Sequence, residues 1–201
     1  MNNSFTKKQL RLLEEDVREQ YEGMEGSRFY RNVDFIVYLI AVALIAMTIR
    51  TFLAEPVRVD GRSMYPNLQD REIMLVEKVS YMFSEPRRGD IVICYYPGYT
   101  DSCVKRVIGL PGETVTILNG KIYIDGELLD ESAYWNDLIL YENNSFTVEE
   151  DSIFVMGDNR NASKDSRNKS VGSIPYERVL GRVRCVFWPF TGARVTGSVR
   201  Y

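Results

Sequence analysis

A serine in the sequence GRSMYPNL, residues 61–68, follows a long apolar segment, and the chain contains no histidine. A serine hydroxyl is a weak nucleophile unless a neighbouring base activates it. The usual serine–histidine–carboxylate arrangement is impossible here, so a catalytic Ser63 needs a lysine, a carboxylate or a metal-bound species as its base. Lys105 is a candidate base, because it stands among apolar residues in the sequence CVKRVI, residues 103–108.

Lys105 is expected to lie in a β-strand, where alternate residues share a face. Cys103 then shares the face of Lys105, whereas Arg106 points to the opposite face. Both faces are otherwise apolar, so both cations are expected to be embedded. Burial lowers the pKa of a lysine, and a neutral amine is what a general base needs near neutral pH. Taken by itself, Lys105 also fits a lysine that extends from a sheet edge into solvent.

A polar segment, GDNRNASKDSR at residues 157–167, follows an apolar run and alternates acids with arginines. This composition suits a hydrogen-bonded network that holds a site, although a solvated turn can have the same composition. The spacing fails the calcium-loop template, because Arg160 occupies a ligand position. Ser-x-x-Lys matches at residues 102–105 and 166–169 lie outside any helical pattern, so both are interpreted as chance.

The elements that would position these residues begin with an apolar run. Residues 35–49 carry no charge and predict a membrane-spanning helix over residues 33–54. A long N-terminal stretch precedes this run and residues 53–56 make a poor cleavage site, so an uncleaved anchor is expected. Lysines and arginines flank both ends of this segment, so their distribution does not decide which end of the helix is cytoplasmic. Residues 6–22 predict a further amphipathic helix.

From residue 55 onward, short β-branched or aromatic runs alternate with turn sequences. This pattern predicts a mostly β domain of coiled antiparallel sheets. Asn119-Gly120, between two such runs, is the strongest hairpin signal. Residues 127–150 are more polar and less regular, and predict an excursion from the domain. The expected strands are residues 73–76, 90–96, 103–108, 114–118, 121–124, 152–156 and 179–187.

The composition argues against several classes of function. The chain has 201 residues, of which 45% are hydrophobic, and a formal net charge of -3, which gives no electrostatic case for nucleic-acid binding. No phosphate-binding loop or dinucleotide fingerprint is present, and the three cysteines lack metal-site spacing, so neither a cofactor nor a metal is expected. Cys94 and Cys103 flank a turn and could form a disulfide, whereas Cys185 is expected to be a buried free thiol.

Four blocks of the sequence, taken in order, resemble the motifs of the bacterial type I signal peptidases. They are GRSMYPNL (61–68), RGDIV (88–92), VKRVIGLPG (104–112) and GDNRNASKDSR (157–167). The chain is similar to the Gram-positive branch, which has a single membrane anchor, and the resemblance covers roughly residues 30–190. It implies a single-pass protein of the cell membrane, with residues 1–32 in the cytoplasm and a catalytic domain, residues 55–201, outside it.

The resemblance also implies roles for individual residues. Ser63 would be the nucleophile and Lys105 the general base, and Ser163 would accept or donate a hydrogen bond that orients the Lys105 amine. The pairs Asp158–Arg106 and Asp165–Arg167 would support the site. Gly61 stands where relatives often carry a serine that stabilises the oxyanion, so the Ser63 N–H would need another donor beside it. Shallow apolar pockets for small substrate side chains would be lined by Val57, Val59, Met64, Leu68, Met74 and Val104.

The expected function is removal of N-terminal signal peptides from exported preproteins through an acyl-enzyme. The substrate is expected to add as a β-strand beside residues 57–61 and 102–105. Its partners would be secreted preproteins and the lipid bilayer, with no nucleic acid. One alternative is a peptidase dedicated to pilins or another narrow set of substrates. Another is a catalytically inactive family member that acts in surface assembly.

Overall fold

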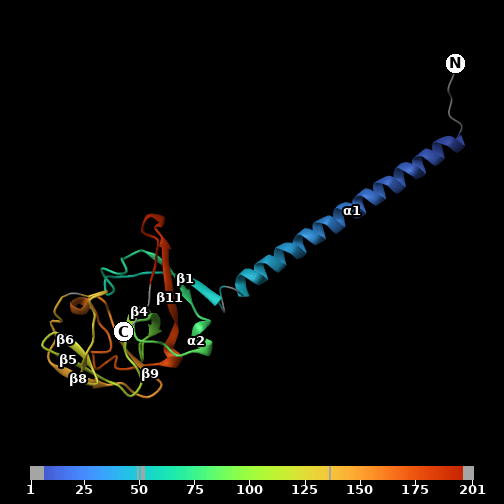
Figure 1. Cartoon of the computed structure of the whole chain (residues 1–201). Coiled ribbons are helices and arrows are strands. Elements are labelled where there is room, and N and C mark those ends of the chain that lie inside the picture. Colours follow the sequence, from blue (N-terminus) through green and yellow to red (C-terminus); the bar gives the residue numbers. More distant parts are fainter. Residues whose placement is uncertain (1–6, 49, 51–52, 136, 197–201) are drawn as a thin grey trace. The chain divides into compact units, whose positions relative to one another are not determined.

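The computed structural model describes residues 7–48, 50, 53–135 and 137–196. The chain divides into two compact units, Met1–Ile49 and Arg50–Tyr201. The first contains one long helix, and the second is a mostly β domain in which all strand pairs are antiparallel (Figure 1). This architecture confirms the predicted fold class.

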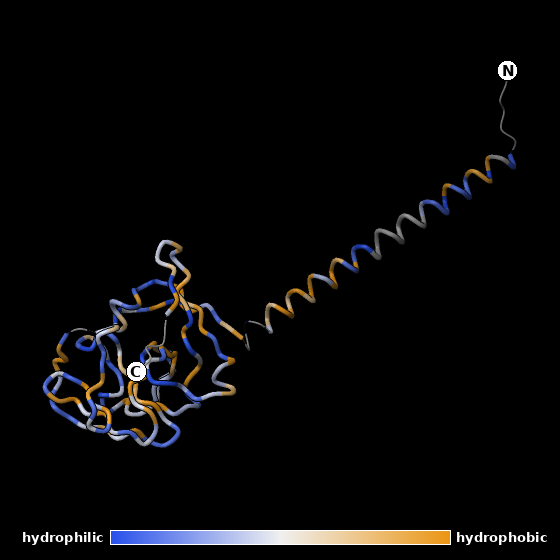
Figure 2. Tube along the Cα trace, viewed as in Figure 1, coloured by the Kyte–Doolittle hydropathy of each residue, from blue (hydrophilic) through white to orange (hydrophobic). Residues whose placement is uncertain are grey.

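The helix α1 (Lys7–Thr48) contains the apolar run. Its part Arg31–Thr48 is long and apolar enough to cross a bilayer, and hydrophobic residues predominate along it in Figure 2. One helix therefore contains most of both segments that were predicted to be helical. The predicted end at residue 54 is too late, because Ala54 already belongs to strand β1. Residues 49, 51 and 52 lie outside the described residues.

The larger sheet has the strand order β1-β2-β11-β3-β4-β9-β10, and β12 pairs with β11. Short helices connect its strands: α2 (Ser80–Phe83), η2 (Arg160–Ala162), η3 (Tyr176–Arg178) and η4 (Phe190–Gly192). The strands are β1 (Ala54–Arg58), β2 (Ile73–Glu77), β3 (Ile91–Tyr95), β4 (Ser102–Gly109), β9 (Ser152–Met156), β10 (Ile174–Pro175), β11 (Val179–Trp188) and β12 (Arg194–Val195).

The smaller sheet has the order β7-β6-β5-β8. Its strands are β5 (Thr114–Leu118), β6 (Lys121–Ile124), β7 (Glu127–Leu128) and β8 (Asn144–Thr147). Asn119 and Gly120 both have positive φ angles, 52° and 75°, as a two-residue type I′ hairpin requires. The predicted hairpin is therefore confirmed. The excursion at residues 127–150 begins with β7 and contains β8, and the segment between these strands is irregular.

Strand β9 is buried along its whole length. Ile153 and Val155 pack with β3 residues such as Val92 on one face. Phe154 and Met156 pack on the other face in a cluster that includes residues of the smaller sheet. The smaller sheet therefore covers one face of the β4–β9 region, and the two clusters fix where the loop after β9 leaves the core.

Strand β4 has an open edge beside residues 102–105. Strand β3 pairs with this part of β4, but β9 pairs with β4 only at Arg106, Val107 and Gly109 among the described residues. Strand β1 stands at the end of the larger sheet and pairs with β2 alone in the described part of the chain. Each of these strands thus has unpaired backbone groups along one side.

Candidate active site

Ser63 lies in the connection between β1 and β2, and the core holds this connection in place. Met64 and Leu68 are 1% and 0% exposed. The loop after β9 also contacts it, because the Asn159 backbone N–H donates a hydrogen bond to the Ser63 carbonyl oxygen at 2.9 Å. A Cβ at Gly157 would lie 2.4 Å from that oxygen, so the close approach of the two segments requires glycine.

Lys105 extends from β4 to the same point and is only 4% exposed. Its amine donates hydrogen bonds to Ser63 Oγ and to the Val104 carbonyl oxygen, each at 2.8 Å. No ion pair among the described residues involves Lys105. The structure thus brings the predicted nucleophile and base into direct contact, at a distance that suits proton transfer.

The predicted pair Asp158–Arg106 is present and buried. Arg106 donates two hydrogen bonds to the Asp158 carboxylate, both at 2.7 Å, and a third at 2.9 Å to the Gly89 carbonyl oxygen. Asn67 adds an amide hydrogen bond to Asp158 at 2.9 Å. Arg106 points away from Lys105, as the strand alternation predicts, so the Asp158 charge is compensated on the far face of β4.

The second predicted pair, Asp165–Arg167, is also present. Arg167 donates to both carboxylate oxygens of Asp165, at 2.8 and 2.9 Å. Asp165 also accepts a hydrogen bond from the Gly157 backbone N–H at 3.0 Å. This pair therefore fixes the glycine that contacts Ser63. A carboxylate held in this way is not free to pair with Lys105, where a close anion would favour the protonated amine.

Ser163 is close to these residues but does not make the hydrogen bond expected of it. Its Oγ is buried and has no hydrogen-bond partner among the described residues. A Cβ at Gly157 would lie 2.3 Å from this oxygen, which places Ser163 beside the segment that holds Ser63. The structure therefore brings Ser163 to the site, while the Lys105 amine is bound by Ser63 and Val104 instead.

A groove of about 540 Å³ contains both Ser63 and Lys105. Residues 57–61 form part of its lining, and residues 100–105 form another part. Of the residues predicted to contact the substrate, the groove is lined by Val57, Val59, Gly61, Met64 and Val104. Leu68 and Met74 do not line it. Both are fully buried in the core cluster that also contains Val59 and Met64. They therefore pack behind residues that line the groove and do not line it themselves.

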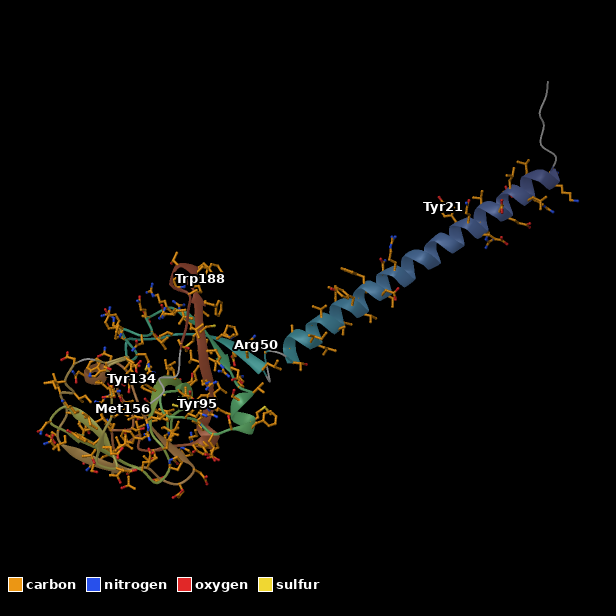
Figure 3. The ribbon with its side chains drawn as sticks, in the orientation of Figure 1. Tyr21, Arg50, Tyr95, Tyr134, Met156 and Trp188 are labelled. Carbon is orange, nitrogen blue, oxygen red and sulfur yellow. The ribbon has the colours of Figure 1, made fainter. Side chains whose placement is uncertain are left out.

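An aromatic side chain that was not predicted from the sequence joins the excursion to the site. Tyr134, labelled in Figure 3, is buried after β7. The guanidinium carbon of Arg106 lies 4.2 Å from its ring centroid, and that of Arg160 lies 5.6 Å away. Both distances suit cation–π interactions. The Tyr134 carbonyl oxygen also accepts a hydrogen bond from Asn67 at 3.1 Å.

Glu131 completes this contact. It forms an ion pair with Arg160 at 2.5 Å and accepts a hydrogen bond from the Tyr134 hydroxyl at 3.0 Å. Burial alone would lower the pKa of Arg160, but the charge of Glu131 beside it raises that pKa above its ordinary value. Arg160 and Asn67 stand inside recognisable motifs. Glu131 and Tyr134 belong to no recognisable sequence motif. They reach the site only because the excursion folds back toward it.

Comparison with known proteins gives the family. Residues 32–188 match the sequence model described as signal peptidase, peptidase S26. The chain is 40% identical to a signal peptidase I of Leptolyngbya laminosa over 154 residues, which are 73% of this chain and 74% of that protein. It is 38% identical to signal peptidase I T of Bacillus subtilis over 167 residues, 79% of this chain and 86% of the relative.

A crystal structure of a signal peptidase I from Enterococcus faecalis is 34% identical to the chain. That likeness covers 49% of this chain and 97% of the solved one, with a TM-score of 0.43. The family match spans all four sequence blocks and both residues of the Ser63–Lys105 contact. The chain therefore belongs to the signal peptidase family, peptidase S26.

Proposed function

We propose that the chain is a membrane-anchored serine endopeptidase that removes signal peptides from exported preproteins, with Ser63 as the nucleophile and Lys105 as the general base. The hydrogen bond of 2.8 Å between the Lys105 amine and Ser63 Oγ, inside an open groove, carries this proposal. Family membership supports the reaction class, and the geometry supports the assignment of the two residues.

In the proposed reaction, the neutral Lys105 amine takes the proton of Ser63 Oγ as that oxygen attacks the scissile carbonyl carbon. The protonated amine then gives this proton to the leaving nitrogen, and an acyl-enzyme remains. Lys105 next removes a proton from water, which attacks the ester and releases the second product. The Ser63 backbone N–H stabilises the oxyanion together with another donor, because Gly61 has no side-chain hydroxyl.

The substrate binds as an added β-strand in this proposal. The unpaired side of β4 at residues 102–105 and the edge strand β1 offer main-chain donors and acceptors to an extended peptide. Val57, Val59 and Val104 give the groove an apolar lining, which suits small side chains near the cut. The buried Ser163 hydroxyl has no hydrogen-bond partner in the part of the chain that the structure describes, and we assign it the role of receiving the Lys105 amine when Ser63 is acylated.

The anchor is the apolar part of α1, Arg31–Thr48. We propose that the N-terminus is cytoplasmic and that residues 55–201 lie outside the cytoplasm, where the cleavage point of an exported preprotein emerges. The partners are then preproteins with signal peptides and the lipid bilayer.

The direct test is incubation of the full-length protein, solubilised in detergent, with a preprotein that carries a signal peptide. We expect cleavage after a small residue at the end of the signal peptide, shown by N-terminal sequencing of the product. The Ser63→Ala variant is the matched control. Cleavage that persists in this variant would assign the activity to another nucleophile or to a contaminant.

A further inference from the structure

Two cysteines face each other across strands β3 and β4, next to the groove. Cys94 and Cys103 are direct partners in the antiparallel pairing, and their sulfur atoms lie 3.6 Å apart. Both are free thiols. Direct partners in antiparallel strands have Cα atoms about 4.5–5.5 Å apart, which lies within the range that a disulfide spans. The two sulfurs are therefore placed for a disulfide without rearrangement of the sheet.

The two thiols differ in access. Cys103 is half-buried and lines the groove together with Lys105, whereas Cys94 is 0% exposed. A reagent that enters the groove can therefore reach Cys103 but not Cys94. The only other cysteine of the chain, Cys185, lies on β11 and is also a half-buried free thiol, so the expectation that it is fully buried is wrong.

The two thiols also differ in acidity. The hydrogen bond with Cys94 is the main cause that lowers the pKa of Cys103 to about 7, and Lys105 adds to this shift when its amine is protonated. The same hydrogen bond, together with burial, raises the pKa of Cys94. Because the thiolate is the reactive form, Cys103 is the thiol that attacks first near neutral pH.

We propose that Cys103 and Cys94 form a redox-active pair, in which Cys103 reacts with a small disulfide that enters the groove and Cys94 then resolves the adduct. In the first step the Cys103 thiolate attacks a disulfide R–S–S–R, forms a mixed disulfide and releases RS⁻. In the second step Cys94 loses its proton, attacks the Cys103 sulfur and releases a second RS⁻. The two cysteines are oxidised by two electrons, and the small disulfide is reduced to two thiols.

The second step protects the groove. A mixed disulfide on Cys103 places a bulky group beside Ser63 and Lys105, where the substrate strand is proposed to bind. A disulfide between Cys94 and Cys103 removes that group and leaves the groove open. Only this consequence depends on the proposed function, since the thiol chemistry itself requires the two cysteines and their access.

The test uses the full-length protein in detergent, with oxidised glutathione as the probe. We expect the wild type to lose two hydrogen masses, to keep no glutathione, and to retain its peptidase activity. Peptide mapping without reduction should find Cys94 linked to Cys103. The Cys94→Ala variant should instead keep one glutathione on Cys103 and lose activity, which dithiothreitol should restore. Cys185→Ala is the matched control and should behave like the wild type.

Two results would overturn the proposal: a stable glutathione adduct on wild-type Cys103, or a Cys94→Ala protein that stays unmodified. Cys94→Ser provides a second variant with a polar side chain of similar size if the alanine protein does not fold. The mass measurements do not depend on peptidase activity. A failure of the proposed function would therefore leave them unchanged, and the two failures can be distinguished.

Discussion

At the scale of single residues, the proposed mechanism gives Lys105 the place that a histidine occupies in most serine hydrolases. A lysine amine needs no third residue to fix a tautomer, but it must be neutral and correctly oriented. The structure supplies orientation through Val104, whose carbonyl oxygen accepts a second hydrogen bond from the amine at 2.8 Å. The carboxylates of Asp158 and Asp165 are both bound by arginines, which keeps them from pairing with the amine.

The first prediction concerns the two reacting side chains. Ser63→Ala and Lys105→Ala should each lower kcat by at least about a hundredfold, because each removes one half of a single proton-transfer unit. The double variant should be scarcely slower than either single variant, since the two residues act together. Steady-state kinetics on protein shown to be folded by circular dichroism checks this. Substantial turnover by folded Lys105→Ala protein would exclude Lys105 as the base.

The second prediction is the pH dependence of catalysis. Lys105 can accept a proton only as the neutral amine, and the neutral fraction of an amine grows as pH rises. We therefore expect kcat/KM to increase with pH. The chain contains no histidine, so no histidine titration can produce the rise in the pH–rate profile. A substrate without titratable groups gives the cleanest profile, and a profile independent of pH would contradict a lysine base.

At the scale of elements, the short strands could be predicted because their signals are local. The strands observed at residues 114–118, 121–124 and 152–156 have the predicted bounds, and β4 extends its predicted range by one residue at each end. The contact of Tyr134 with Arg106 could not be predicted in this way. It depends on how the irregular part of the excursion folds back, and no periodic pattern describes that path.

The third prediction tests whether this contact stabilises the site. Tyr134→Leu should lower the free energy of unfolding by about 1–3 kcal/mol, because it removes the ring between two buried guanidinium groups. Tyr134→Phe is the matched control. It keeps the ring, loses the hydrogen bond from its hydroxyl to Glu131, and should cost about 1 kcal/mol. Urea unfolding measures both changes, and equal losses in the two variants would assign the effect to the hydroxyl rather than to the ring.

At the scale of the whole molecule, the chain combines an apolar helix with a β domain that contains the site. The β domain spans Arg50–Tyr201, and the span Arg31–Thr48 precedes it closely in the chain. The sequence predicts the helix from its length and composition, whereas its orientation does not follow from the charges that flank it.

The fourth prediction concerns this orientation. If residues 55–201 lie outside the cytoplasm, a protease added to intact protoplasts should digest the β domain. The reason is that export precedes cleavage, so the site must be where the exported chain emerges. Immunoblotting with an antibody against the β domain measures the loss, and a cytoplasmic protein serves as the control for intact cells. Full protection in intact protoplasts, with digestion only after lysis, would reverse the proposed topology.

The unpaired sides of β1 and β4 could bind a substrate strand, but they also expose the protein to self-association. A strand edge with free N–H and C=O groups pairs with any extended chain, including the same edge of a second molecule. Charged side chains are a common defence against such self-association, and Arg58, Asp60 and Asp101 all line the groove between these edges. If these edges bind preprotein strands as proposed, the same edges could pair two copies of the protein, and we expect replacement of these three charges to lower its solubility at high concentration.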